Sequence, residues 1–142
     1  MSAEDDIRKS IARFANSFDL KDWALMESVL AEDLTVDYSD LRGDPPKEVS
    51  AREYVQARRE ALDALDTQHI IANLEITIDG KQASVEASSM IFRTLDGLVF
   101  NTHARYHFRL FQDQDRGWVI DRIKQTVLWN EGDPGIHGGV KK

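Results

Sequence analysis

The sequence has 142 residues, with 25 acidic and 18 basic side chains, 42% hydrophobic residues and no cysteine. Its length suits one domain with its own core, and the lack of cysteine excludes disulfides, thiolate nucleophiles and zinc–thiolate sites. A formal net charge of -7 would repel phosphate backbones and anionic lipids, and no run approaches the roughly 20 apolar residues of a membrane span, so neither nucleic acid nor membrane is an expected partner.

The first part of the chain has the apolar spacing of helices. A capping start at Ser2 precedes apolar residues that recur at helical steps, namely Ile7, Ile11, Phe14 and Phe18. A second, short helix is predicted over 21–30, and "AEDLTVDYSD" then has the alternation of a short strand. The N-terminal region should therefore supply packed helices and one strand.

A loop and a third helix are expected next. The stretch "LRGDPPKEV", residues 41–49, contains one glycine and two prolines, which predicts a loop. Ser50 and Glu53 have the spacing of a capping box, and the following "AREYVQARREALDAL" predicts a helix over 51–65 with Tyr54 on its buried side.

From Thr67 onward the pattern alternates, as in strands. Four extended runs are predicted, at 67–78, 82–94, 98–112 and 117–129, separated by turn sequences that close hairpins. Helices followed by consecutive hairpins indicate one α+β domain over 1–142, in which a curved, mostly antiparallel sheet wraps around the helices. The glycine-rich segment at about 131–142 is expected to be a flexible tail.

Three polar residues in apolar surroundings are candidates for catalysis. Asp19, Tyr38 and His69 are an acid, a phenol and an imidazole, which together suffice for acid–base chemistry without metal or cofactor. Each also has a structural alternative. Asp19 could only cap the second helix, His69 could be a hydrogen-bonded core histidine, and Tyr38 could be a half-buried strand aromatic.

The order of these residues resembles a known family. The segment "FANSFDLKDWALMESVLAEDLTVDYSD", then "DTQHIIAN", a meander and "WNEGD" are similar to the SnoaL-like group of the nuclear transport factor 2-like superfamily, and within it to scytalone dehydratase and bile-acid dehydratases. The resemblance implies a cone-shaped, cystatin-like fold. It also implies that Asp19 and His69 form the Asp–His pair at the base of the cone and that Tyr38 polarises the substrate.

The resemblance also suggests residues that contact the substrate and shows departures from the dehydratases. Phe18 replaces a frequent tyrosine, the strand around Met90 lacks the second pocket histidine, and Tyr106 occupies an amide-bearing position, so scytalone itself is not the expected substrate. Residues expected to contact a small hydrophobic substrate are Phe18, Trp23, Tyr54, Met90, Tyr106, Phe108 and Trp129.

The other histidines do not predict a metal site. His103 and His107 share a strand face with Arg105 and Arg109, but four residues along a strand span about 13 Å, too far for one metal ion. This basic face should lie outside the sheet, as a subunit interface or a solvated surface, while the alternate apolar residues face the pocket. His137, in the expected tail, carries little weight.

The sequence therefore favours a cofactor-free dehydratase or isomerase acting on a small hydrophobic hydroxy-carbonyl compound. The alternatives are a ligand-binding or assembly domain without chemistry, and an epoxide or lactone hydrolase. A hydrolase usually needs more carboxylates, Asn or Arg in the pocket than this sequence is expected to place there. The enzyme hypothesis requires Asp19 to contact His69 beside a cavity. A cytoplasmic location is expected, since the start "MSAEDDIRKS" resembles neither a secretory nor a transit signal. The resemblance to scytalone dehydratase implies a homo-oligomer, a trimer or alternatively a dimer.

Overall fold

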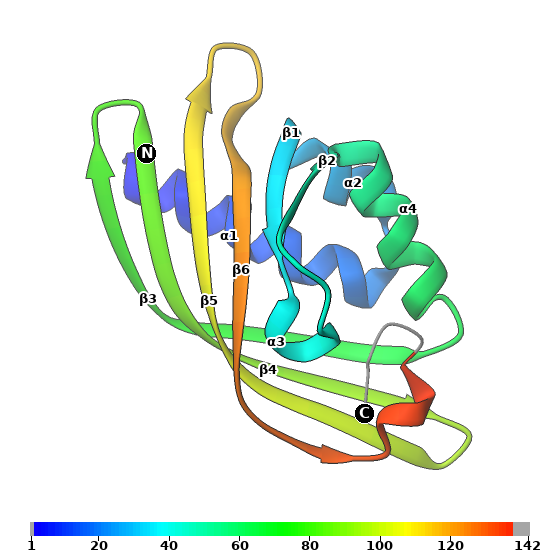
Figure 1. Cartoon of the computed structure of the whole chain (residues 1–142). Helices are drawn as coiled ribbons and strands as arrows, with labels where there is room; N and C mark the ends of the chain where they lie inside the picture. Colours follow the sequence, from blue (N-terminus) through cyan, green and yellow to red (C-terminus); the bar gives the residue numbers. More distant parts are fainter. Residues whose placement is uncertain (1, 138–142) are drawn as a thin grey trace.

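A six-stranded sheet curves around the first helix and carries the other helices at one end (Figure 1). The computed structural model describes residues 2–137. The strand order is β2-β1-β6-β5-β4-β3, and every neighbouring pair is antiparallel except β1 with β6, which is parallel. The predicted α+β fold with a curved, mostly antiparallel sheet is confirmed.

The first two helices begin at side-chain caps. Helix α1, Ala3–Leu20, starts at Ser2, whose side chain accepts a hydrogen bond from the backbone of Asp5, and it ends at Lys21, which is left-handed with φ of 53°. Asp22 caps α2, Trp23–Ser28. The second helix is therefore shorter than the predicted 21–30, because the left-handed turn at Lys21 separates it from α1.

The segment predicted as a loop contains two short elements. Strand β1, Leu30–Asp37, is followed by α3, Ser39–Arg42, and by β2, Lys47–Ser50. The loop prediction for 41–49 is wrong at both ends, because Gly43 ends α3 in a left-handed conformation and β2 then pairs along the free edge of β1. Helix α4, Ala51–Leu62, has the predicted capping box and stops three residues early.

The four long strands match their predicted positions closely. They are β3, Asp66–Asp79; β4, Gln82–Leu95; β5, Leu98–Asp113; and β6, Gly117–Gly132. The tail predicted for 131–142 is contradicted at its start: residues 131 and 132 complete β6, and a 3₁₀ helix, η1, covers Pro134–Ile136. His137 follows with 4% of its surface exposed, and residues 138–142 lie outside the described part.

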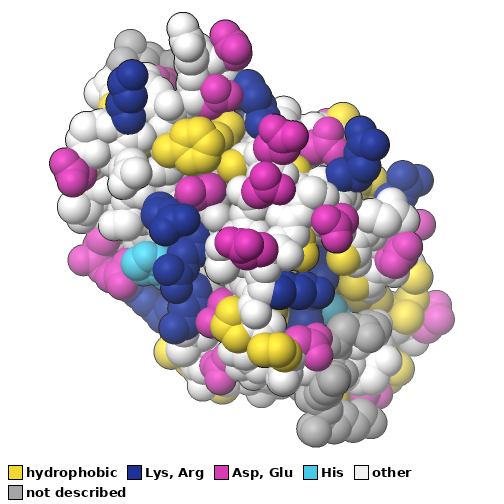
Figure 2. All heavy atoms as spheres, turned by 45° about the horizontal axis from the view of Figure 1, so that its top comes forward, with side chains coloured by type: hydrophobic (Ala, Val, Ile, Leu, Met, Phe, Trp, Pro, Cys, Tyr) yellow, Lys and Arg dark blue, Asp and Glu magenta, His cyan; other side chains and the backbone are white. Residues whose placement is uncertain are grey.

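The outer surface carries charges of both signs. Figure 2 shows acidic and basic side chains interspersed across one face of the molecule, with small apolar patches between them. On the outer face of β5, His103 contacts Glu131, Arg105 contacts Glu75, and Arg109 forms two hydrogen bonds with Asp121. These residues lie outside the sheet, as expected. Among the described residues, no helix is long and apolar enough to cross a membrane.

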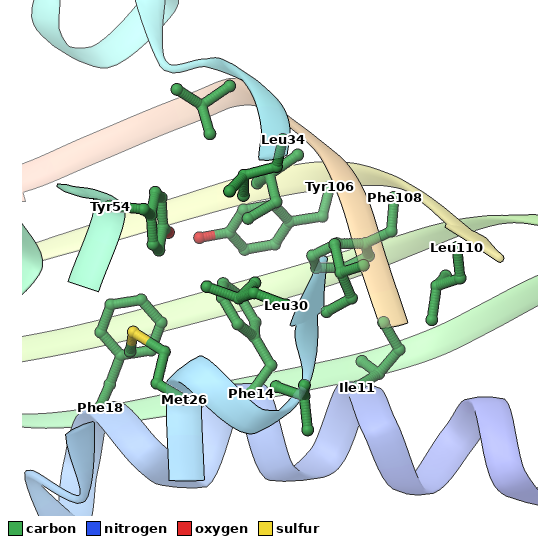
Figure 3. Close-up of a cluster of buried hydrophobic side chains, with 14 of the residues drawn as sticks. Ile11, Phe14, Phe18, Met26, Leu30, Leu34, Tyr54, Tyr106, Phe108 and Leu110 are labelled. Carbon is green, nitrogen blue, oxygen red and sulfur yellow. The ribbon is translucent and has the colours of Figure 1, made fainter. Parts of the chain in front are cut away.

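The core lies between α1 and the concave face of the sheet. Figure 3 shows Phe14 and Phe18 of α1 on one side and Tyr106 and Phe108 of β5 on the other. The Phe14 ring packs edge-on against both Phe18 and Phe108, at centroid distances of 5.1 and 5.7 Å. Burying each such side chain contributes about 1.5–3 kcal/mol to the stability of the fold, so this cluster holds α1 firmly against the sheet.

Candidate active site

Asp19 and His69 form a closely hydrogen-bonded pair. The Nδ1 of His69 lies 2.7 Å from Oδ1 of Asp19, and the His69 backbone N–H donates to Oδ2 at 2.8 Å. Thr67 Oγ1 donates to Oδ1 at 3.1 Å. Because a carboxylate only accepts hydrogen bonds, Nδ1 carries the proton and Nε2 is the ring nitrogen available for reaction.

The fold explains why these two residues meet. Asp19 lies in the last turn of α1 and His69 lies near the start of β3, so the packing of α1 against the sheet joins them. The capping alternative for Asp19 is wrong, since Asp22 caps α2 instead by accepting from the backbone of Leu25. Phe18, one residue before Asp19, stacks on the imidazole at 4.2 Å and 20°, which fixes the ring plane.

Burial keeps His69 in its neutral form. The side chain of His69 is 5% exposed, and burial lowers its pKa below the ordinary value, while the hydrogen bond and the charge of Asp19 oppose that shift and Arg93 adds to it. A neutral imidazole oriented by a carboxylate is the form that accepts a proton. His69 is therefore poised as a base.

Tyr38 belongs to a buried group of phenols. Its hydroxyl lies 2.6 Å from that of Tyr54, and Gln125 donates to the hydroxyl of Tyr106 at 3.2 Å. The hydroxyls of Tyr54 and Tyr106 point toward one another in Figure 3. Burial raises the pKa of all three phenols, so they remain protonated and can act as donors.

His69 and Tyr38 line the same small cavity. Its free volume is about 20 Å³, close to the space that one water molecule needs. The cavity is bordered by residues of α1, α3, α4, the sheet and the residue that follows η1. The lining residues are Phe18, Tyr38, Leu41, Arg42, Arg58, Leu62, His69, Ile91, Arg93, Tyr106, Gln125 and His137.

Several predicted contact residues lie elsewhere. Met90 and Trp129 are 39% and 55% exposed and point to the outer side of the sheet, so their prediction as pocket residues is wrong. Met90 alternates with the buried Ile91, and Trp129 stacks on His103 at 4.2 Å. The position of each residue along its strand explains both errors, because neighbouring residues of a strand point to opposite faces of the sheet.

Trp23, Phe108 and Tyr54 support the site without lining the cavity. Trp23 is half-buried and packs against the core at the start of α2. Phe108 is fully buried and stacks on Tyr106 at 5.0 Å, and Tyr54 contacts the hydroxyl of Tyr38. Phe18 and Tyr106 do reach the cavity, as predicted.

Sequence reasoning missed the polar half of the lining. Arg42, Arg58, Arg93, Gln125 and His137 all line the cavity, so the expectation of few arginines there is wrong. Arg58 and Arg93 occupy positions that the helical and strand periods make inward-facing, which was the available signal. His137 had no such signal, because its burial depends on η1 turning back toward the sheet.

His137 is strongly affected by this environment. Burial lowers its pKa to about 3, and the positive charges of Arg93 and Arg42 add to the shift. Among the described residues, no group of three histidine or carboxylate side chains is placed to hold a metal ion.

Comparison with solved structures supports the fold. A protein of Kribbella flavida is 27% identical, with a TM-score of 0.86 over 90% of this chain and 92% of its own. A candidate scytalone dehydratase of Novosphingobium aromaticivorans is 12% identical, with a TM-score of 0.79 over 92% of this chain and 87% of that one.

A third structure carries the name of the fold. It is a nuclear transport factor 2-like protein with a cystatin-like fold, also from Novosphingobium aromaticivorans, and it is 18% identical with a TM-score of 0.71 over 88% of this chain and 81% of that one. No curated protein matches the chain significantly. The model of the SnoaL-like domain matches residues 1–124. The chain therefore belongs to the SnoaL-like family, with the nuclear transport factor 2-like, cystatin-like fold.

Proposed function

We propose that this protein is a hydro-lyase or isomerase that acts on a small hydroxy-carbonyl compound, with His69 as the base and no cofactor. The main support is the 2.7 Å contact of Asp19 with His69 Nδ1 beside a cavity that Tyr38 also lines. Membership of the SnoaL-like family and the likeness to a candidate scytalone dehydratase agree with this class of reaction.

In the proposed reaction, His69 Nε2 removes a proton from the carbon next to the substrate carbonyl. The electron pair of that C–H bond forms an enolate, whose oxygen accepts a hydrogen bond from the Tyr38 hydroxyl. Asp19 stabilises the imidazolium that results. Tyr38 is suited to this role because Tyr54 holds its hydroxyl from one side, at 2.6 Å.

The fate of the enolate decides the product. Where a hydroxyl group lies on the adjacent carbon, the enolate expels it as the imidazolium returns its proton, so that water leaves and a carbon–carbon double bond forms. Where no leaving group is present, the imidazolium returns the proton at another carbon and the compound isomerises. The same three residues serve both outcomes.

Substitution of the pair tests this proposal. Hydroxy-ketones are screened for loss of water by mass spectrometry and by the ultraviolet absorbance of the enone product. With any substrate found, His69→Ala and Asp19→Asn should each lower kcat by roughly a hundredfold or more, because one removes the base and the other its orienting charge. Unchanged turnover in both folded variants would contradict the proposal.

Asp22→Asn is the matched control for Asp19→Asn. Asp22 lies three residues away and caps α2 through the backbone of Leu25, and asparagine caps helices as well as aspartate does. This variant loses the same charge but should keep the wild-type kcat.

A hydrolase is the second candidate, and the arginines of the cavity favour it. In that reaction the His69 base would activate a water molecule against an epoxide or lactone, and a guanidinium would stabilise the oxygen that leaves carbon. Product mass separates the two candidates, since hydrolysis adds water to the compound and the proposed lyase removes it.

A further inference from the structure

Three arginines from three elements meet at the cavity. Arg42 is the last residue of α3, Arg58 lies on α4 and Arg93 lies on β4. Arg58 and Arg93 are only 7% and 4% exposed. Among the described residues, the cavity is thus lined by three guanidinium groups and by no acidic side chain, whereas the surface in Figure 2 mixes both signs.

Nothing in the described part of the chain neutralises these charges. None of the three arginines forms an ion pair there, and the Nε of each is buried without a hydrogen-bond partner. Arg93 donates through Nη1 to Thr102 at 2.8 Å and to the carbonyl of Phe100 at 3.4 Å. Asp19 is occupied by its contacts with His69 and Thr67.

The concentration of positive charge costs stability. Burial lowers the pKa of Arg93 to about 10, and the charge of Arg42 contributes to that shift. Uncompensated buried charges are unfavourable unless another role requires them. A bound anion would supply the missing opposite charge and accept the free N–H groups.

Aromatic rings lie against all three guanidinium groups, and Arg93 lies 5.1 Å above the ring centroid of Phe100. Arg42 lies 4.5 Å above the ring centroid of Tyr38, and Arg58 lies 5.5 Å from the centroids of both Tyr38 and Tyr54. A guanidinium that stacks on a ring keeps its N–H edge free, and that edge matches the two oxygens of a carboxylate.

From this geometry we infer that the substrate of the proposed reaction is an organic acid, whose carboxylate binds to Arg42, Arg58 and Arg93. This inference rests on the proposed function for the reaction and extends it to the substrate class. The carboxylate lies on the arginine side of the cavity and the reacting carbon lies toward His69. The apolar side chains of Phe18, Leu62 and Ile91 contact the carbon skeleton.

Binding of a matched pair of planar probes tests the inference. Cinnamate and cinnamamide have nearly the same size and shape and differ in charge, and calorimetry gives the Kd of each. The wild-type protein should bind cinnamate at least tenfold more tightly than cinnamamide. Equal binding, tighter binding of the amide, or no binding of cinnamate overturns the inference.

Two neighbours on α4 provide the variant and its control. Arg58→Gln should abolish the preference for cinnamate, because this side chain lines the cavity, and Arg59→Gln should retain it, because Arg59 is exposed. A thermal melt checks that both variants fold. If Arg58 only braced the two tyrosines, Arg58→Gln would lower Tm and leave the preference intact, which would overturn its role as an anion ligand.

Two further arms separate the possible outcomes. Phenyl phosphate is titrated in parallel, and tighter binding of this probe than of cinnamate would overturn the assignment to carboxylates.

In the His69→Ala variant the preference for cinnamate should persist, since the base does not hold the anion. If the wild-type protein shows no preference for cinnamate but His69→Ala still lowers turnover, the organic acid is rejected and the proposed lyase stands. If the wild-type protein prefers cinnamate but His69→Ala leaves turnover unchanged, only the lyase is rejected.

Discussion

At the scale of single residues, the site depends on opposing effects on one imidazole. Burial and the charge of Arg93 lower the pKa of His69, while Asp19 raises it, and the net direction is downward. A base with a lowered pKa is present in its reactive neutral form at neutral pH, and its proton affinity still benefits from the carboxylate. Phe18 contributes by stacking on the imidazole ring, which fixes the ring plane.

The pH dependence of kcat/KM should report this balance. Activity of the free enzyme should fall as pH decreases through the pKa of His69, with the acidic limb below pH 6.5, because protonation removes the base. Asp19→Asn should move the limb to lower pH, since it removes a group that raises the pKa. An acidic limb above pH 6.5 in the wild-type profile would contradict the assignment of His69.

At the scale of elements, α3 carries both Tyr38 and Arg42 to the cavity. Tyr38 is its N-cap residue, and the backbone amides of Leu41 and Arg42 both donate to the Tyr38 carbonyl. The carboxylate of Asp40 accepts a hydrogen bond from the backbone of Val127 in β6 at 2.6 Å. This contact ties the short helix to the sheet.

Asp40→Ala should loosen this element. Loss of a charge-assisted hydrogen bond to a backbone amide costs roughly 1.5–3 kcal/mol, so exchange of the Val127 amide and of the amides of α3 should accelerate by about tenfold or more. Hydrogen exchange followed by NMR measures the effect. Glu32→Ala, at an exposed position of β1, should leave these amides unchanged.

The sequence predicted the long elements well because their patterns are local. Alternation along β3 to β6 and the hydrophobic spacing of α1 follow from the side-chain direction at each residue. The element β2 escaped prediction because an edge strand of four residues, Lys47–Ser50, is defined by its partner β1 rather than by its own sequence. Met90 and Trp129 were misplaced for a related reason, since periodicity shows which residues share a face but does not fix which face is inside.

At the scale of the whole molecule, closure of the cavity joins the two ends of the described chain. Phe18 of α1 lines it near one end, and His137, which follows η1, lines it at the other. The pKa of His137 is lowered to about 3 from 6.5 in the folded protein. As pH falls, His137 therefore binds a proton at a higher pH in the unfolded chain than in the folded one. The stabilising contribution of neutral His137 is complete above pH 6.5 and is lost progressively between pH 6.5 and 3.

His137→Gln should therefore make the protein less sensitive to acid. Each pH unit between the two pKa values costs about 1.4 kcal/mol, so the fall in the free energy of unfolding from pH 7 to pH 5 should be about 2 kcal/mol smaller in the variant. Urea denaturation at the two pH values measures it. An equal fall in both proteins would show that His137 titrates normally in the folded state.

The size of the cavity has a consequence for the speed of catalysis. About 20 Å³ is far less than an organic acid occupies, so the proposed binding of such an acid beside His69 requires α3, α4 or the η1 segment to move. Encounter and capture are then separate events, and the observed rate of binding reaches a plateau at high ligand concentration, set by the frequency with which the protein opens. In the proposed reaction, turnover would then be limited by access and release as well as by proton transfer.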